Sequence, residues 1–225
     1  LLAHVDSEEV RKRFQREFRA LSQLEHPNVI RVFEAGLLGQ RPFYVMELLA
    51  GHDLKREMEL WQDLSLSERF RRAEDVLLQV CAALAHIHAR GLVHRDISPS
   101  NVFVLHTGDV KLMDFGVVKE PGTDLTSVGE LVGTVAYIAP EQFTGERVDE
   151  RADLYSLGAV LYVMLTGRRP FHARTLAGYL EKHMHRAPRP PKEIVPSLPD
   201  HLDDACLRLL AKAPADRFAS AHHLL

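Results

Sequence analysis

Apolar residues recur at helical spacing in several segments of the chain. Between residues 7 and 24 they lie three or four positions apart, which predicts an amphipathic helix. Its apolar stripe consists of Val10, Phe14, Phe18, Leu21 and Leu24. Asp6 and Glu9 have the spacing of an N-cap and its N3 partner, and Pro27 favours an end to the helix just before it.

Two runs rich in β-branched and aromatic residues follow this helix. Residues 29–34 and 43–48 are separated by a segment that contains glycine, and they predict a pair of strands. Residues 102–105 and 110–113 flank a His-Thr-Gly-Asp turn and predict a hairpin.

Helical patterns dominate the rest of the chain. Residues 67–90 carry a long apolar stripe, and Gly91 is placed to cap the C-terminal end of that helix. Residues 151–166 are apolar on almost every side, which is typical of a helix in the middle of a core. Further helices are expected at residues 174–186, at residues 202–211 and from about residue 219 onwards.

The expected fold class is α+β, with a short mixed segment followed by a larger helical one. We expect the seam near residues 48–54, with residues 1–48 in the first part and residues 49–225 in the second. Five prolines between residues 187 and 199 predict a loop in the second part.

Composition and charge narrow the class of protein. The 28 Lys and Arg against 31 Asp and Glu give a net charge of −3, which disfavours a strongly basic nucleic-acid binder and an acidic disordered tail. The apolar run at residues 159–165 is far shorter than the ~20 residues of a membrane span. Two cysteines, Cys81 and Cys206, cannot form a disulfide framework and favour a reducing compartment. Because the chain begins with Leu1 and not Met, we expect it to be part of a longer protein.

Three short motifs carry the chemistry. His-Arg-Asp at residues 94–96 is followed by Asn101, five positions after the Asp. Asp-Phe-Gly at residues 114–116 begins thirteen residues after Asn101, and Ala-Pro-Glu follows at residues 139–141. Their order and spacing match signatures of protein kinases, and three such matches in order exclude coincidence.

These residue types suit phosphoryl transfer, which depends on positioning and charge neutralisation more than on covalent chemistry. Asp96 is placed to accept the proton of an incoming hydroxyl. The side-chain carbonyl of Asn101 and the carboxylate of Asp114 are oxygen ligands of the kind that Mg²⁺ prefers. The loop before the predicted hairpin and the turn after it lie at the same end of the hairpin. The side chains of Asp96, Asn101 and Asp114 can therefore lie close together.

With these motifs the chain resembles the bacterial members of the eukaryotic-like Ser/Thr protein kinase family, over essentially all of its 225 residues. The resemblance implies a two-lobed fold, with part of the small β-rich lobe in residues 1–48 and the hinge and helical lobe in residues 49–225. It implies ATP and Mg²⁺ as cofactors and the Ser and Thr of proteins as substrates. It also implies a cytoplasmic kinase domain, a full-length protein that can be membrane-anchored, and self-association for autophosphorylation.

Six residues match nucleotide-binding positions of that family: Glu17, Met46, Glu47, Leu49, Asp53 and Phe103. Glu17 matches the glutamate that pairs with the ATP-gripping Lys, with a solvated surface residue as the alternative. Met46 matches the gatekeeper, and backbone groups of Glu47 and Leu49 would bond adenine above Phe103. Asp53 falls at the ribose position, and a helix N-cap is the alternative reading.

The resemblance also assigns roles around the activation segment. Thr134 would bond the catalytic Asp96 and mark Ser/Thr specificity. Glu141 would form an internal ion pair with Arg217, and Asp153 would brace the catalytic loop from within the helical lobe.

Arg95 indicates regulation, because an unneutralised Arg beside the catalytic Asp can bind a phosphate on the activation segment. The candidate phosphorylation sites are Thr123, Thr126 and Ser127, of which we favour Thr126.

The chain departs from the family at two places. Ser98 stands where most Ser/Thr kinases have a Lys that contacts the transferred phosphate, so it removes a positive charge from the catalytic site. The Gly-rich loop and the Val-Ala-x-Lys strand are absent from the sequence, so we expect the chain alone to bind ATP poorly and to have little activity.

These departures keep two other readings open. One is a pseudokinase or scaffold that binds partners without catalysis, and the retained Asp96, Asn101 and Asp114 argue against it. The other is a small-molecule kinase, which the complete peptide-docking segment at residues 133–141 argues against. The histidines at residues 183, 185, 222 and 223 lack metal-ligand spacing and are expected to be surface or packing residues.

Overall fold

The computed structural model describes residues 22–38, 41–114, 135–144 and 148–225. The helix predicted at residues 7–24 lies almost entirely outside these ranges. Five of the predicted site residues also lie outside them: Glu17, Thr123, Thr126, Ser127 and Thr134.

The first sheet is an antiparallel pair of strands, β1 (Val32–Leu38) and β2 (Arg41–Met46). The predicted pair is confirmed, but its first strand begins three residues later than expected. Val29 instead forms a parallel bridge with Leu112, and the Ile30 N–H donates to the Leu112 carbonyl at 2.9 Å. Val29 and Ile30 are therefore buried against the second sheet before β1 begins.

The second sheet has the order β3-β4-β5 and is antiparallel throughout. Its strands are β3 (Gly51–Asp53), β4 (Val102–Leu105) and β5 (Val110–Leu112), and the last two form the predicted hairpin. The pattern did not indicate β3, because three residues are too few to show alternation. A Cβ atom at Gly51 would lie 2.0 Å from the carbonyl oxygen of Val104, so glycine allows β3 to approach β4 this closely.

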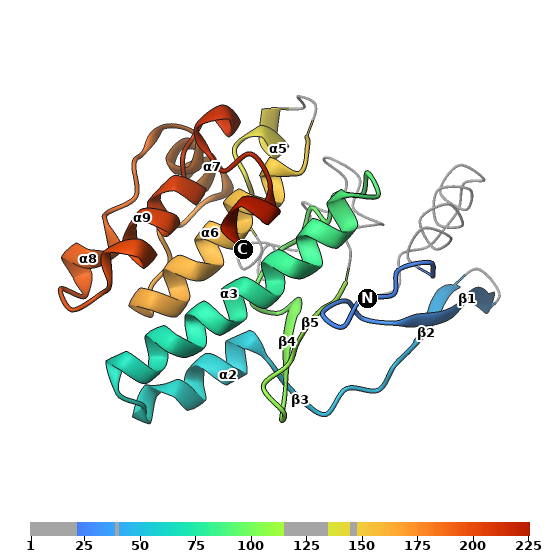
Figure 1. Cartoon of the computed structure of the whole chain (residues 1–225). Helices are drawn as coiled ribbons and strands as arrows, with labels where there is room; N and C mark the ends of the chain where they lie inside the picture. Colours follow the sequence, from blue (N-terminus) through green and yellow to red (C-terminus); the bar gives the residue numbers. More distant parts are fainter. Residues whose placement is uncertain (1–21, 39–40, 115–134, 145–147) are drawn as a thin grey trace.

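Two helices follow β3 and lie along the second sheet (Figure 1). The short α2 (Leu54–Leu60) was not predicted, and it continues into a 3₁₀ turn, η1 (Trp61–Asp63). The long α3 (Leu66–His88) agrees with its prediction to within two residues at either end. Ser65 caps α3 by accepting from the Glu68 N–H, and Gly91 lies just beyond its end with φ +70°.

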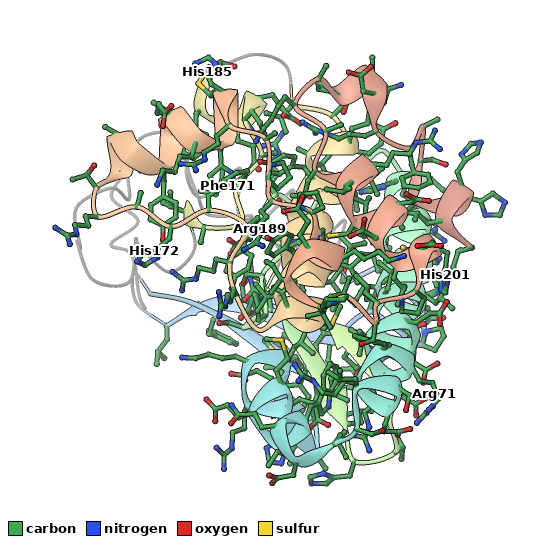
Figure 2. The ribbon with its side chains drawn as sticks, turned by 90° about the vertical axis from the view of Figure 1, so that its left-hand side faces the viewer. Arg71, Phe171, His172, His185, Arg189 and His201 are labelled. Carbon is green, nitrogen blue, oxygen red and sulfur yellow. The ribbon has the colours of Figure 1, made fainter. Side chains whose placement is uncertain are left out.

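The helix α6 (Arg151–Thr166) lies at the centre of the core, as its apolar pattern predicts. It packs against α3 and against α9 (Asp200–Leu209), and every residue from 152 to 162 is buried. Gly158 permits the close approach to α9, since a Cβ atom there would lie 2.6 Å from the Cβ of Leu209. At the surface, His201 Nε2 of α9 lies 3.2 Å from Glu74 Oε1 of α3. His201 is labelled near the right-hand edge of Figure 2.

The remaining elements are short: α5 (Glu141–Thr144), α7 (Leu176–His185), α8 (Pro191–Ile194), η2 (Pro214–Asp216) and η3 (Ala221–Leu224). The prediction of a continuous loop at residues 187–199 was wrong, because α8 lies within it. Pro191 occupies the first turn of α8, where a fixed φ favours the helix and no N–H is required. The last predicted helix is only the 3₁₀ turn η3.

Figure 1 shows the β1–β2 sheet on one side of the molecule and α6 to α9 on the other, with α3 and the β3–β4–β5 sheet between them. Cys81 and Cys206 are both fully buried in the core, as their apolar helix faces predict. Burial raises the pKa of the Cys81 thiol to about 12. Within the described ranges, no helix combines the length and the hydropathy needed to cross a membrane.

Candidate active site

The loop between α3 and β4 holds Asp96 and Asn101 in direct contact. Asn101 Nδ2 donates to the backbone carbonyl of Asp96 at 2.7 Å and to its carboxylate Oδ2 at 2.8 Å. Asn101 is buried, and its N–H donates to the Ser98 carbonyl at 3.0 Å, which closes the turn. Because the amide nitrogen is engaged, the side-chain oxygen of Asn101 is the atom available to a cation.

Asp114 reaches the same place from the end of β5. The preceding residue, Met113, donates its N–H to the Asn101 carbonyl at 2.8 Å and accepts from His94 Nε2 at 2.9 Å. Asp114 is exposed and has φ +48°, a left-handed conformation that is uncommon outside glycine. The structure therefore brings the two halves of the predicted site together, as the geometry of the hairpin suggested.

Asp153 supports the catalytic loop from the buried helix α6. Its Oδ2 accepts from the His94 N–H at 2.8 Å, and its Oδ1 accepts from the Arg95 N–H at 2.7 Å. His88 Nε2 lies 2.8 Å from the same Oδ2. Arg95 has φ +67°, so this carboxylate holds the backbone in a strained conformation immediately before Asp96.

His94 is completely buried at the centre of this network. Burial lowers the pKa of His94, although the nearby carboxylates of Asp153, Asp96 and Asp114 oppose the shift. A neutral ring fits the hydrogen bonds, since Nε2 donates to a carbonyl and Nδ1 accepts from the Asp96 N–H at 3.3 Å. His94 therefore orients the backbone on both sides of the catalytic loop.

Ser98 is buried within the loop, with 6% of its surface exposed. The sequence from 94 to 101 contains one cationic residue, Arg95, whose side chain is exposed. The carbonyl of Arg95 accepts from Gln142 Nε2 at 3.0 Å, which connects the catalytic loop to α5. The sequence did not predict this contact of Gln142, because a single polar residue after Ala-Pro-Glu forms no recognisable pattern.

The predicted hinge follows β2. The Glu47 carboxylate accepts from the Arg31 N–H and from Lys111 Nζ, each at 2.8 Å. Burial alone would raise the pKa of Glu47, but these hydrogen bonds hold it below its usual value. The side chain thus faces β5, and the backbone carbonyl of Glu47 has no hydrogen-bond partner within the described residues. Met46 is 40% exposed and Leu49 is half-buried.

Asp53 and Phe103 lie opposite each other in the β3–β4 register. Asp53 Oδ1 accepts from the Arg56 N–H at 2.7 Å and caps α2, which is the alternative role that the sequence left open. Phe103 is half-buried on β4.

Glu141 and Arg217 form a buried pair at the end of the activation segment. The two guanidinium nitrogens of Arg217 lie 2.5 and 2.9 Å from the two carboxylate oxygens of Glu141. Arg217 also donates to the carbonyls of Arg151, Ala211 and Lys212, so all of its nitrogens are engaged.

A second buried polar cluster was not predicted. Tyr155 OH lies 2.9 Å from His183 Nδ1, and Lys212 Nζ lies 3.3 Å from the same hydroxyl. Burial, followed by the charge of Lys212, lowers the pKa of His183 to about 4. Burial also lowers the pKa of Lys212 to about 8. The only sequence signal was a histidine on an otherwise apolar helix face.

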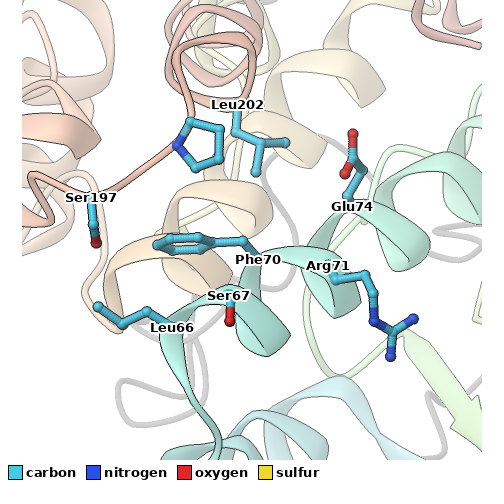
Figure 3. Close-up of a pocket in the computed structure, with 8 residues that line it drawn as sticks. Leu66, Ser67, Phe70, Arg71, Glu74, Ser197 and Leu202 are labelled. Carbon is cyan, nitrogen blue, oxygen red and sulfur yellow. The ribbon is translucent and has the colours of Figure 1, made fainter.

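A pocket of about 360 Å³ lies away from these groups, between the start of α3 and the loop before α9 (Figure 3). Phe70, Leu202 and Pro199 form much of its wall. Its charged groups are already paired, Arg71 with Glu68 and Asp75, and Glu74 with His201. The pocket shares no residue with the predicted active site.

Comparison with known proteins agrees with this geometry. Residues 2–225 match the family model described as the protein kinase domain. The chain belongs to the protein kinase family. This protein kinase domain is 41% identical over 218 residues to the serine/threonine-protein kinase Pkn1 of Myxococcus xanthus, covering 94% of this chain and 31% of Pkn1. It is 35% identical over 216 residues to the serine/threonine-protein kinase PknB of Mycobacterium tuberculosis, covering 93% of this chain and 34% of PknB.

A solved structure shares the fold of this kinase domain. The crystal structure of the Mycobacterium tuberculosis PknI kinase domain superposes with a TM-score of 0.72 at 30% identity, covering 98% of this chain and 79% of that one. The predicted two-lobed kinase fold is thereby confirmed. The chain spans about a third of the length of the curated relatives described above.

Proposed function

We propose that the chain is the catalytic part of a Ser/Thr protein kinase, which transfers the γ-phosphoryl group of ATP to the hydroxyl of a protein Ser or Thr. The observation that carries this proposal is the contact between the Asn101 amide and the Asp96 carboxylate, beside Asp114. A non-catalytic scaffold has no chemical need for this arrangement. The match to bacterial relatives named as serine/threonine-protein kinases supports the same conclusion.

The transfer step assigns Asp96 the role of base. The substrate hydroxyl oxygen forms a bond to the γ-phosphorus, and the bond from that phosphorus to the bridging oxygen breaks, so ADP leaves. The hydroxyl proton passes to the Asp96 carboxylate. Asn101 orients that carboxylate by donating to Oδ2, and Asp153 fixes the backbone of the two residues before it.

The donor atoms fit Mg²⁺. The exposed Asp114 carboxylate and the Asn101 side-chain oxygen are both hard oxygen ligands, and Mg²⁺ in kinases is held by one or two such groups together with the phosphates. When bound, the ion neutralises the charge that develops on the phosphates.

Nucleotide binding is proposed at the end of β2. Backbone groups of Glu47 and Leu49 would hydrogen-bond adenine next to Met46, with Phe103 beneath the ring. Asp53 would contact ribose from its place at the start of α2. Because Asp53 already caps that helix, its ribose role would require the carboxylate to serve both partners.

Four further roles rest on the family resemblance alone. Glu17 would pair with an ATP-binding Lys, and Thr134 would bond Asp96. A phosphate on the activation segment, at Thr126 in preference to Thr123 or Ser127, would pair with the exposed Arg95. Autophosphorylation would proceed through self-association of the kinase domain in the cytoplasm.

The test is phosphoryl transfer from radiolabelled ATP to a protein substrate by the full natural protein. Asp96→Asn should lower kcat by about 10²–10⁴-fold, the usual contribution of a general base. The melting temperature should stay unchanged, which separates loss of catalysis from loss of fold. Equal transfer by the wild type and by Asp96→Asn would contradict the proposal, as would absence of transfer by the wild type.

A further inference from the structure

A basic stretch begins where α6 ends. Between residues 168 and 192 the sequence has seven Lys and Arg but a single acidic residue, Glu181, in a chain whose net charge is −3. The seven are Arg168, Arg169, Arg174, Lys182, Arg186, Arg189 and Lys192. They occupy the loop between α6 and α7, the helix α7, the segment that leads to α8 and, for Lys192, α8 itself.

Hydrogen bonds bring the parts of this stretch together. Tyr162 OH of α6 donates to the Arg189 carbonyl at 2.9 Å. Burial raises the pKa of Tyr162; the charges of Arg189 and Arg168 oppose that rise, and the charge of Asp203 adds to it. Lys182 Nζ of α7 donates to the His172 carbonyl at 2.5 Å. Figure 2 labels His172, on the loop between α6 and α7, and Arg189, on the segment that leads to α8.

Several of these cations have no acidic partner among the described residues. Arg189 pairs with Glu193, and Lys192 pairs with Asp200. Within the part of the chain that the structure describes, no carboxylate lies within ion-pair distance of the exposed Arg168, Arg174 or Arg186. We call the exposed surface of residues 168–192 the basic face. Unneutralised surface cations attract negatively charged partners and raise their rate of association.

The basic face contacts residues 137–142, and this segment in turn contacts the catalytic loop. The Arg169 guanidinium lies 6.0 Å from the ring centre of Tyr137, and its Nη1 donates to Tyr179 OH at 3.3 Å. Tyr137 lies four residues before Glu141 in the closing part of the activation segment. Gln142 then bonds the carbonyl of Arg95, next to Asp96. A short path of contacts thus runs from the basic stretch to the catalytic base.

We propose that the basic face binds an acidic segment of the protein substrate and so directs the kinase to Ser and Thr near clusters of Asp and Glu. This inference rests on the proposed function and adds a substrate class to it. Nucleic acid fits less well, because single strands bind through exposed aromatic rings, whereas Phe171, Tyr179 and Tyr162 are buried here.

The experiment compares two peptides with the same Ser acceptor, one with a run of glutamates and one with glutamines in their place. The full natural protein is assayed as wild type and as Arg168→Ala/Arg174→Ala. Both side chains are exposed, and neither contributes a side-chain hydrogen bond within the described residues, so the fold should be retained. Lys55→Ala/Arg69→Ala, which removes two cations from α2 and α3, is the matched control.

The wild type should prefer the glutamate peptide through a lower KM at equal kcat. The double variant should lose roughly threefold to tenfold in kcat/KM for that peptide only, as expected for two surface charge contacts. The effect should weaken at high salt. The control variant should behave as the wild type. Absence of a preference in the wild type, or an equal preference in the double variant, would overturn the inference while leaving the proposed function intact.

Binding measured without turnover separates the two proposals. Fluorescence anisotropy of the labelled glutamate peptide should show tighter binding to the wild type than to Arg168→Ala/Arg174→Ala. If this difference appears while no peptide is phosphorylated, the basic face is supported and the proposed function fails. An RNA of equal charge that binds the same face more tightly than the peptide would overturn the assignment of an acidic protein segment.

Discussion

Arg217 Nη1 donates to Glu141 Oε1 at 2.5 Å, and Arg217 Nη2 donates to Glu141 Oε2 at 2.9 Å, across 76 residues of sequence. The Arg217 side chain is fully buried, and it also donates to three backbone carbonyls. The pair therefore joins the end of the activation segment to the last turns of the helical lobe. Because both charges have left water, the pair is costly to break from either side.

Arg217→Met should lower the free energy of unfolding by about 3–5 kcal/mol, since it leaves the Glu141 carboxylate buried without its partner. Urea denaturation monitored by circular dichroism measures the loss. Arg189→Met is the matched control, because Arg189 pairs with Glu193 at the exposed surface and should cost about 1 kcal/mol or less. Similar losses in the two variants would show that the buried pair contributes no more than a surface pair.

Asp153→Asn should weaken the support of the catalytic loop. An amide keeps one acceptor oxygen, so one of the His94 and Arg95 N–H groups would face the new NH₂ group and remain unsatisfied. We expect a loss of about 1–3 kcal/mol in unfolding free energy and a fall in kcat larger than any change in KM. Thermal denaturation and steady-state kinetics of the full protein measure both. Asp75→Asn, which alters an exposed ion pair of α3, should change neither quantity appreciably.

Gly158→Ala tests the contact between α6 and α9. The added Cβ would lie 2.6 Å from the Leu209 Cβ, so the two helices would have to move apart. Overpacking of this kind typically costs about 1–3 kcal/mol. Leu209→Gly removes the Cβ that the new methyl group would meet, so it should relieve part of the strain. A double-mutant cycle by chemical denaturation should give a coupling energy different from zero, and strict additivity would contradict the contact.

His183 should make stability depend on pH in the acid range. Its pKa is lowered to about 4 in the folded protein, against 6.5 for an unperturbed histidine, because the ring is buried and faces Lys212. Its Nδ1 contacts Tyr155 OH, and its buried Nε2 has no hydrogen-bond partner within the described residues. Between pH 6.5 and 4 the unfolded chain therefore binds a proton that the folded one does not.

The stabilising effect of a neutral His183 should be complete above pH 6.5 and lost as the pH falls to 4. The loss should amount to about 3 kcal/mol. His183→Gln cannot titrate there, so its unfolding free energy should fall less steeply over that range, whatever its value at pH 7. Urea denaturation at a series of pH values compares the slopes. Equal slopes for the wild type and the variant would contradict a titrating His183.

Long elements could be predicted from the sequence because many residues repeat one pattern. In α3 and α6 the apolar positions are numerous, and Gly91 lies just beyond the end of α3, where the sequence placed a cap. The short β3, α2 and α8 could not be predicted, whereas the equally short β4 and β5 could, because a turn sequence lies between them. Three to seven residues give too few repeats, and β3 depends on the close approach of Gly51 to Val104.

For this protein the sequence alone determined the family and the order of the three kinase motifs, and it proposed Asp96, Asn101 and Asp114 as the catalytic groups, because phosphoryl transfer requires particular residue types at fixed spacing. Only the tertiary structure decided that Asp53 caps α2, that Gln142 bonds the Arg95 carbonyl and that His88 lies beside the Asp153 carboxylate. These features arise from contacts between residues distant in sequence or from the burial of a side chain. Neither produces a repeating pattern in the sequence from which it could be predicted.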